Sequence, residues 1–241
     1  LKIIKKPYFY QRPSFIISVF AIVIGVVILI IKMRFDRLKR QKQETEKMSI
    51  EVIQALVGTI DAKDKYTNGH SIRVAQYSKM ISKALGDSEE EQKRVYYSAL
   101  LHDIGKIGIP DTIINKPATL TKEEYDIVKT HPEIGSQILR SITTMKEISV
   151  GARWHHEQFD GSGYPDKLKG EDIPKIARII GVADAYDAMT SNRSYRRYLP
   201  QDKVRKEFEE NKSSQFDSKM AEIMIKIIDE DTDYQLHEQL N

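Results

Sequence analysis

The sequence predicts an all-α protein, in which a single transmembrane helix and a linker helix precede a helical bundle. Residues 13–31 read PSFIISVFAIVIGVVILII, an apolar run without a charged side chain. Beyond residue 50, apolar side chains recur at helical spacing, for example at Val74, Tyr77, Ile81 and Leu85. No segment shows the sustained alternation of apolar and polar residues that is typical of a strand.

The apolar run is long enough, as a helix, to cross the roughly 30 Å hydrocarbon core of a bilayer. It is too long for a typical signal peptide, and no small-residue cleavage site follows it. A buried core helix is the alternative. Residues 1–48 hold 11 Lys and Arg against 3 Asp and Glu, and the denser basic cluster follows the run. The positive-inside rule therefore predicts a single-pass anchor in the inner (plasma) membrane with the C-terminal body in the cytoplasm.

We expect five parts along the chain, with these boundaries: a basic juxtamembrane segment 1–12, the transmembrane helix 13–31, a linker helix 32–54, a globular domain 55–229 and a charged tail 230–241. The amphipathic linker pattern, which extends to about residue 60, fits either a homodimer contact or a plain spacer packed on the domain. Because the chain begins with Leu1 rather than Met, we expect a piece of a longer protein.

Two capping boxes predict helix starts in the globular part, Ser88–Glu91 and Thr121–Glu124. Gly86 is expected to end the helix before the first of them. The helices expected beyond Gly86 lie near residues 89–104, 121–140, 145–157, 174–190, 201–211 and 217–229. Gly and Pro cluster in the segments 104–120 and 160–174, and each follows a segment that carries histidine. Loops of this kind often carry functional residues.

Histidine is concentrated in the globular part, and cysteine is absent. Any metal must therefore bind to imidazole and carboxylate, which suits iron, manganese or zinc. Three histidines belong to the two doublets His102-Asp103 and His155-His156. Neighbouring residues on a helix point about 100° apart, so each doublet can direct two donors into one space between helices. The body has an excess of acidic residues, and we expect no nucleic-acid polymer as partner.

Four motifs in this order resemble the HD-GYP branch of the HD phosphohydrolase superfamily. They are HDIGK at 102–106, His131, HHEQFDGSGYP at 155–165, and Asp184 within VADAYDAMTSNRSYR. The resemblance covers roughly residues 55–229 and is too specific for a chance match. It implies an HD-domain helical bundle and a metal-dependent phosphodiesterase whose usual substrate is cyclic di-GMP.

By position, the resemblance implies a set of seven metal ligands: His70 (in GHSIRV), His102, Asp103, His131, His155, His156 and Asp184. Asp103 corresponds to a carboxylate that bridges two metals. Family members with a third metal carry a glutamate four positions before the first histidine, where this sequence has Tyr66. We therefore expect two divalent or transition metal ions. Iron or manganese is favoured, and zinc, nickel and magnesium are compatible.

The expected reaction is attack on the phosphodiester by a hydroxide that bridges the metals, giving linear pGpG and, after a second round, GMP. Asp103 and Lys106 are the expected catalytic residues: the first assists proton transfer, and the second binds a non-bridging phosphate oxygen. Arg193 and Arg196 match family positions that hold phosphate. Tyr164 is expected to line the pocket entrance and to stack on a base. The plainer roles are a helix cap for Lys106, a solvated surface cluster for the arginines and packing for Tyr164.

Three other functions stay open from sequence. One is hydrolysis of another nucleotide phosphoester, such as a mixed cyclic dinucleotide. Another is a catalytically inactive domain that binds the nucleotide or a partner for signal transduction. A purely structural bundle is the last. Every ligand position that can be matched is filled, which argues against the inactive domain.

Overall fold

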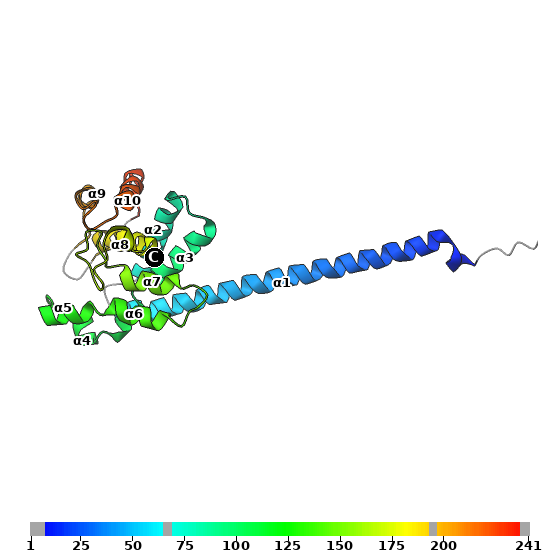
Figure 1. Cartoon of the computed structure of the whole chain (residues 1–241), viewed down its shortest axis with the longest axis horizontal. Coiled ribbons are helices and arrows are strands. Elements are labelled where there is room, and N and C mark those ends of the chain that lie inside the picture. Colours follow the sequence, from blue (N-terminus) through cyan, green and yellow to red (C-terminus); the bar gives the residue numbers. More distant parts are fainter. Residues whose placement is uncertain (1–7, 65–68, 193–196, 237–241) are drawn as a thin grey trace, which may run out of the picture. The chain divides into compact units, whose positions relative to one another are not determined.

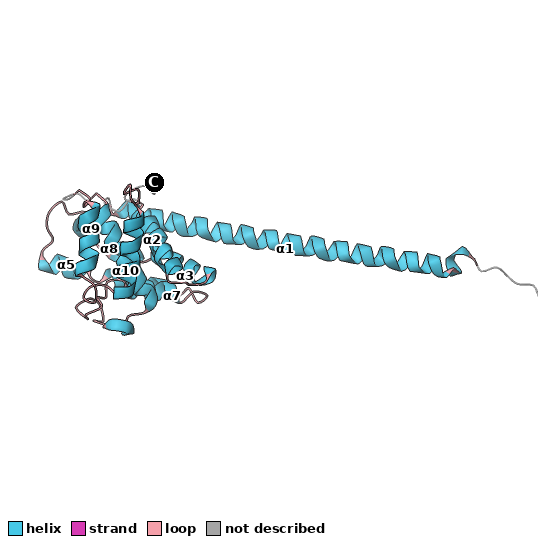
Figure 2. Ribbon diagram, turned by 90° about the horizontal axis from the view of Figure 1, so that it is seen from above, coloured by secondary structure: helices cyan, strands magenta, loops and turns pink. Residues whose placement is uncertain are grey.

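The computed structural model describes residues 8–64, 69–192 and 197–236. Within these ranges every regular element is a helix, as predicted (Figure 2). The chain divides into two compact units, residues 1–52 and 53–241. The long helix α1, Pro13–Lys63, begins in the first unit and ends in the second.

The described part of the first unit holds a short 3-10 helix, η1 (Phe9–Gln11), and most of α1. The most apolar stretch of α1 has a mean hydropathy of 3.2, and none of it is buried by the rest of the chain. By length and composition α1 is able to span a membrane, although a signal sequence near an N-terminus would have the same properties. The expected linker helix is not a separate element, since α1 continues without interruption to Lys63.

The second unit is a bundle built around α2 (His70–Ala84), α3 (Glu89–Leu100) and α8 (Lys175–Thr190) (Figure 1). Helix α2 packs against α3 and α8, and α7 (Glu147–Trp154) contacts both α3 and α8. Helices α9 (Gln201–Glu210) and α10 (Ser218–Glu230) pack on each other and on α8. The core includes the edge-to-face pair Tyr77 and Tyr186, whose ring centroids lie 4.8 Å apart.

Shorter helices lie between these elements along the chain: η2 (Ile104–Gly108), α4 (Asp111–Ile114), α5 (Lys122–Val128), α6 (His131–Leu139) and η3 (Gly170–Asp172). Both predicted capping boxes form, at Ser88 before α3 and at Thr121 before α5. Helix α2 ends two residues before Gly86, whose φ of +85° favours glycine.

The single helix expected over residues 121–140 is wrong. Two helices, α5 and α6, stand there instead. In a continuous helix residue 132 would donate to the carbonyl of Val128, but Pro132 has no N–H. That carbonyl instead accepts a hydrogen bond from Nδ1 of His131 at 2.8 Å. The proline therefore breaks the helix and leaves a carbonyl that fixes the histidine ring.

Candidate metal centre

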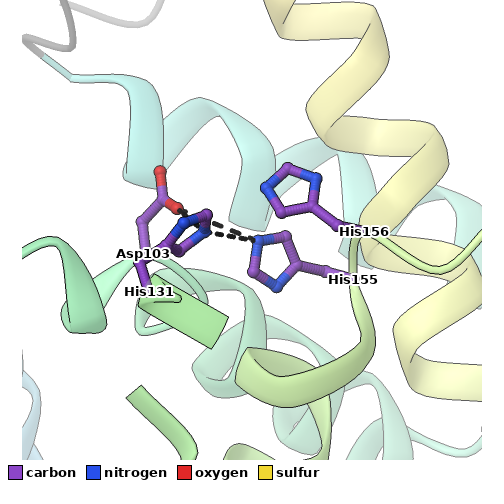
Figure 3. A group of neighbouring side chains, drawn as sticks. All are labelled: Asp103, His131, His155 and His156. Atoms are coloured by element: carbon purple, nitrogen blue, oxygen red, sulfur yellow. Dashed lines mark hydrogen bonds and ion pairs between the residues drawn. The ribbon is translucent and has the colours of Figure 1, made fainter. Parts of the chain in front are cut away.

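The structure brings together all seven side chains that the sequence predicted as ligands. They form two groups, and within each group the ligand atoms lie within 4.8 Å of one another. The first group is Asp103, His131, His155 and His156, and the second is His70, His102 and Asp184. Figure 3 shows the three imidazoles and the carboxylate of the first group around a common space.

Asp103 links the two groups. Its Oδ1 lies 3.2 Å from Nε2 of His131 and 3.8 Å from Nε2 of His155. Its Oδ2 lies 3.5 Å from Nε2 of His70 and 3.4 Å from Nε2 of His102. Asp184 faces the second group, with Oδ1 3.4 Å from Nε2 of His70. Each oxygen of Asp103 thus faces its own pair of imidazoles, which is the geometry of a carboxylate shared between two cation positions.

Three of the imidazoles are held by carbonyls at helix ends. Nδ1 of His102, His131 and His155 donates to the main-chain carbonyl three residues earlier, at 2.7, 2.8 and 3.0 Å. Because a carbonyl only accepts, each Nδ1 carries the proton and each Nε2 presents its lone pair to the site. The expectation that the doublets lie on helical faces is wrong. They follow the ends of α3 and α7, where carbonyls lack the usual helical N–H four residues later.

His70 is held by a carboxylate instead. Its Nδ1 donates to Oδ2 of Asp187 at 2.7 Å, and Nε of Arg73 donates to Oδ1 of Asp187 at 2.6 Å. Burial disfavours a charged His70, but hydrogen bonds to Asp103 and Asp187 outweigh it and raise the pKa of His70 to about 10. Burial likewise opposes ionisation of Asp187, yet His70 and Arg73 lower the pKa of Asp187 to about 2. Asp187 therefore orients the ring of His70 through the nitrogen that faces away from the site.

We expect Asp187→Asn to weaken metal binding by about 10- to 100-fold, because the charge that orients the His70 ring is lost. The dissociation constant for Mn²⁺, measured on the full chain in detergent by competition with a chelator, tests this. Asp126→Asn is the control, because Asp126 is an exposed residue on α5 that pairs only with Lys129 among the described residues. Equal affinity in the Asp187 variant, the control and the wild type would contradict this role.

The donor set fits divalent cations. Nε2 of His102 is buried and has no hydrogen-bond partner among the described residues, and an unpaired buried polar atom costs about 1–3 kcal/mol. Burial and the neighbouring imidazoles lower the pKa of His155, and the same causes lower the pKa of His156 to about 3. Both side chains are therefore neutral at pH 7, the form that binds a metal. Imidazole and carboxylate without thiolate suit iron or manganese.

Lys106 lies beside the bridging carboxylate. Its Nζ is 2.8 Å from Oδ2 of Asp103 and 3.0 Å from Oδ2 of Asp64. Burial opposes its charge, but the two carboxylates outweigh this and raise the pKa of Lys106. Asp64 has no motif around it, and sequence reasoning therefore missed it. Because Asp64 follows α1 directly, the end of the long helix is tied to the site.

The GYP segment folds back over His156. The ring of Tyr164 stacks on the His156 ring, with centroids 4.8 Å apart and planes 26° apart. Asp160 accepts from the N–H of Ser162 at 2.8 Å, and Gly161 has a φ of +87°, so the predicted turn-forming role of this segment is confirmed.

Glu157 directly follows the His155-His156 doublet and binds the main chain beyond it. Its carboxylate accepts from the main-chain N–H groups of Asp166 at 2.7 Å and Leu168 at 3.1 Å. It therefore closes the loop that carries Tyr164. Three further residues singled out from sequence, Tyr66, Arg193 and Arg196, lie outside the described residues.

A cavity of about 570 Å³ opens beside the two groups, a volume within the range of small-molecule sites, about 300–1,000 Å³. His155, His156 and Asp184 line it at the metal groups, and Tyr164 lines it as predicted. Apolar side chains from α8, including Val182 and Met189, form part of its wall. A phosphate ester in this cavity would contact the candidate metal ligands.

The HD domain family matches residues 25–220 of the chain. The fold and the paired histidine and aspartate groups are thus those of an HD domain protein. Within that family the chain belongs to the HD-GYP branch, as its motifs indicated.

Three named relatives are similar to this chain over two thirds or more of its length. The 3'3'-cGAMP-specific phosphodiesterase 2 of Vibrio cholerae is 36% identical over 78% of this chain and 36% of its own length. The cyclic di-GMP phosphodiesterase response regulator RpfG of Xanthomonas campestris is 42% identical over 67% of this chain and 43% of its own length. The cyclic di-GMP phosphodiesterase of Thermotoga maritima is 39% identical over 79% of this chain and 52% of its own length. The chain thus spans between about a third and a half of these relatives.

Solved structures share the fold. A cyclic GMP-AMP specific phosphodiesterase of V. cholerae, V-cGAP3, aligns with a TM-score of 0.58 at 20% identity, over 76% of this chain and 49% of its own. Bd1817, an HDGYP protein from Bdellovibrio bacteriovorus, aligns with a TM-score of 0.57 at 18% identity, over 73% of this chain and 64% of its own. At these identities the likeness concerns the fold alone.

Proposed function

We propose that this chain is a metal-dependent phosphodiesterase that hydrolyses a cyclic dinucleotide, cyclic di-GMP by preference, to linear pGpG and then GMP. The observation that carries the proposal is Asp103, whose two oxygens face separate pairs of imidazoles. The relatives named cyclic di-GMP phosphodiesterases support this substrate. Because another relative is named for 3'3'-cGAMP, that mixed dinucleotide is the second candidate.

In this proposal the seven side chains hold two divalent cations, with iron or manganese favoured. Such a pair of ions lowers the pKa of a bound water towards neutrality and stabilises charge on the phosphate oxygens. Asp103 holds both metal positions at a fixed separation and accepts a proton at a carboxylate oxygen. Lys106, already charged and beside Asp103, donates from Nζ to a non-bridging phosphate oxygen. Arg193 and Arg196 bind phosphate, and Tyr164 contacts the substrate at the cavity wall.

We also propose that α1 anchors the chain in the inner (plasma) membrane and places the second unit in the cytoplasm. The apolar stretch of α1 and the basic residues around it support this. The exposed apolar residues Met48, Val52 and Leu56 at helical spacing support a homodimer through this helix.

The test is turnover by the full chain, purified anaerobically in detergent and loaded with Mn²⁺ or Fe²⁺. Substrates are cyclic di-GMP, 3'3'-cGAMP, cyclic di-AMP and the base-free diester bis(p-nitrophenyl) phosphate. Chromatography of the products is expected to show pGpG before GMP from cyclic di-GMP. Tight binding of cyclic di-GMP without turnover in any metal would identify a binding domain instead. Turnover of the base-free diester without turnover of any cyclic dinucleotide would indicate another phosphoester as substrate.

A further inference from the structure

The cavity beside the metal groups is also lined by polar side chains that are not candidate metal ligands. His155, His156 and Asp184 form what we call its metal end. Further polar lining residues come from the start of α8, from α9 and from the segment that joins α9 to α10, among them Arg178, Glu207, Asn211, Gln215 and Asp217. Apolar residues of α8 line the cavity as well. A substrate whose phosphate lies at the metal end therefore meets additional polar groups in the same cavity.

Three of the four carboxylates that line this cavity already have close partners. Asp184 faces the metal groups, and Glu157 accepts from two main-chain N–H groups. Asp217 pairs with Arg178 and accepts from the N–H groups that begin α10. The charge of each is therefore compensated within the protein.

Glu207 is the exception. Within the described part of the chain, its carboxylate accepts a single hydrogen bond, from Nδ2 of Asn211 at 3.4 Å. The same amide donates to the main-chain carbonyl of Glu207 at 2.8 Å, which keeps the two side chains together at the end of α9. An ionised carboxylate accepts at two oxygens with about four lone-pair positions. Glu207 lines the cavity and is exposed, so its carboxylate has acceptor capacity for a molecule that occupies the cavity.

The substrate proposed above is itself anionic, so a carboxylate in the same cavity repels it unless the carboxylate meets hydrogen-bond donors. Guanine presents two adjacent donors, N1–H and the N2 amino group, on its Watson–Crick edge. Adenine presents the N6 amino group beside N1, which is an acceptor and would face a carboxylate oxygen unfavourably. Among the two purines, guanine alone matches both oxygens of a carboxylate.

We propose that Glu207 binds the Watson–Crick edge of a guanine base in this cavity and selects guanine over adenine, with Asn211 positioning its carboxylate. The inference rests on the proposed function, because the phosphodiester at the metal end is what places a base in the cavity. The proposal assigns a group that binds the base. The candidate metal ligands lie at the phosphate and do not contact the base. A site that hydrogen-bonds a specific base edge discriminates strongly, because the wrong base leaves its polar groups unpaired. Glu207 is an exposed side chain, and a bound base would cover its carboxylate.

The test compares the full chain in detergent with Glu207→Gln. Dissociation constants for cyclic di-GMP and cyclic di-AMP are measured calorimetrically without metal, and kcat/KM values are measured with Mn²⁺. Glutamine offers one acceptor and one amino donor group, which matches adenine better than guanine. We expect the preference for cyclic di-GMP over cyclic di-AMP to fall by about 10-fold or more, in binding and in kcat/KM.

Glu210→Gln is the matched control. Glu210 is an exposed residue of the same helix, paired with Lys206, and it does not line the cavity. If both variants keep the wild-type preference, or if both change it equally, the assignment of Glu207 is overturned while the phosphodiesterase proposal stands. A wild-type chain that neither binds nor hydrolyses cyclic dinucleotides would overturn the proposed function, and the base site with it.

Discussion

Asp103→Ala is expected to lower turnover of the cyclic dinucleotide by about 10³-fold or more, equivalent to roughly 4 kcal/mol of transition-state stabilisation. Among the described residues, this carboxylate is the one whose two oxygens approach both sets of imidazoles. Burial opposes ionisation of Asp103, but the charge of Lys106 and the contacts with the histidines outweigh burial and hold the pKa of Asp103 well below its usual range. Without it, the two proposed cations lose their shared ligand.

The measurement is kcat/KM with saturating Mn²⁺, together with far-ultraviolet circular dichroism to show that the bundle remains helical. Asp103→Asn, which keeps the size of the side chain and removes its charge, is expected to lose nearly as much activity. Asp229→Asn serves as control, because Asp229 is half-exposed and pairs with Arg205 on the surface. Wild-type turnover in both Asp103 variants would refute the assignment of the site.

Gly105→Ala is expected to destabilise the second unit by about 3 kcal/mol, the upper part of the range for overpacking. A Cβ at this position would lie 1.8 Å from the carbonyl oxygen of His131 and 2.5 Å from the main-chain nitrogen of Gly135. Both neighbours are backbone atoms, so η2 and α6 must move apart. That movement would also separate Asp103 from His131, and turnover is expected to fall at least 10-fold in addition to the loss of stability.

Thermal unfolding of the full chain in detergent measures the first effect, and a decrease in Tm of about 6–12 °C is expected. Gly58→Ala is the control, because a Cβ there meets nothing within 4 Å. Alanine inside a helix is also favoured over glycine, by up to about 1 kcal/mol. If Gly105→Ala melts at the wild-type temperature, the close approach of η2 to α6 does not hold the site together.

The sequence predicted which side chains form the site better than it predicted how the fold positions them. Residue types and motif order were enough to indicate the seven ligands, because metal coordination demands particular side chains. The break between α5 and α6 could have been predicted from Pro132, since proline cannot donate to the carbonyl four residues earlier. The role of that carbonyl in fixing His131 could not, because it depends on where the ring turns after the break.

Other features depend on contacts between distant segments and leave no local pattern. Asp64 meets Lys106 across 42 positions, and no motif marks it. Glu207 resembles any charged residue on an exposed helix until the cavity shows what it faces. Gly105 lies inside a recognised motif, but its close contact with α6 appears only once both helices are placed.

The claim on which the whole account depends is that two cations bind, one near each oxygen of Asp103. An anomalous difference map from crystals of the chain grown with Mn²⁺ tests it most directly. The account predicts two peaks, one among Asp103, His131, His155 and His156 and the other among Asp103, His70, His102 and Asp184. A single peak, or peaks away from Asp103 in crystals of chain that is active in solution, would contradict it.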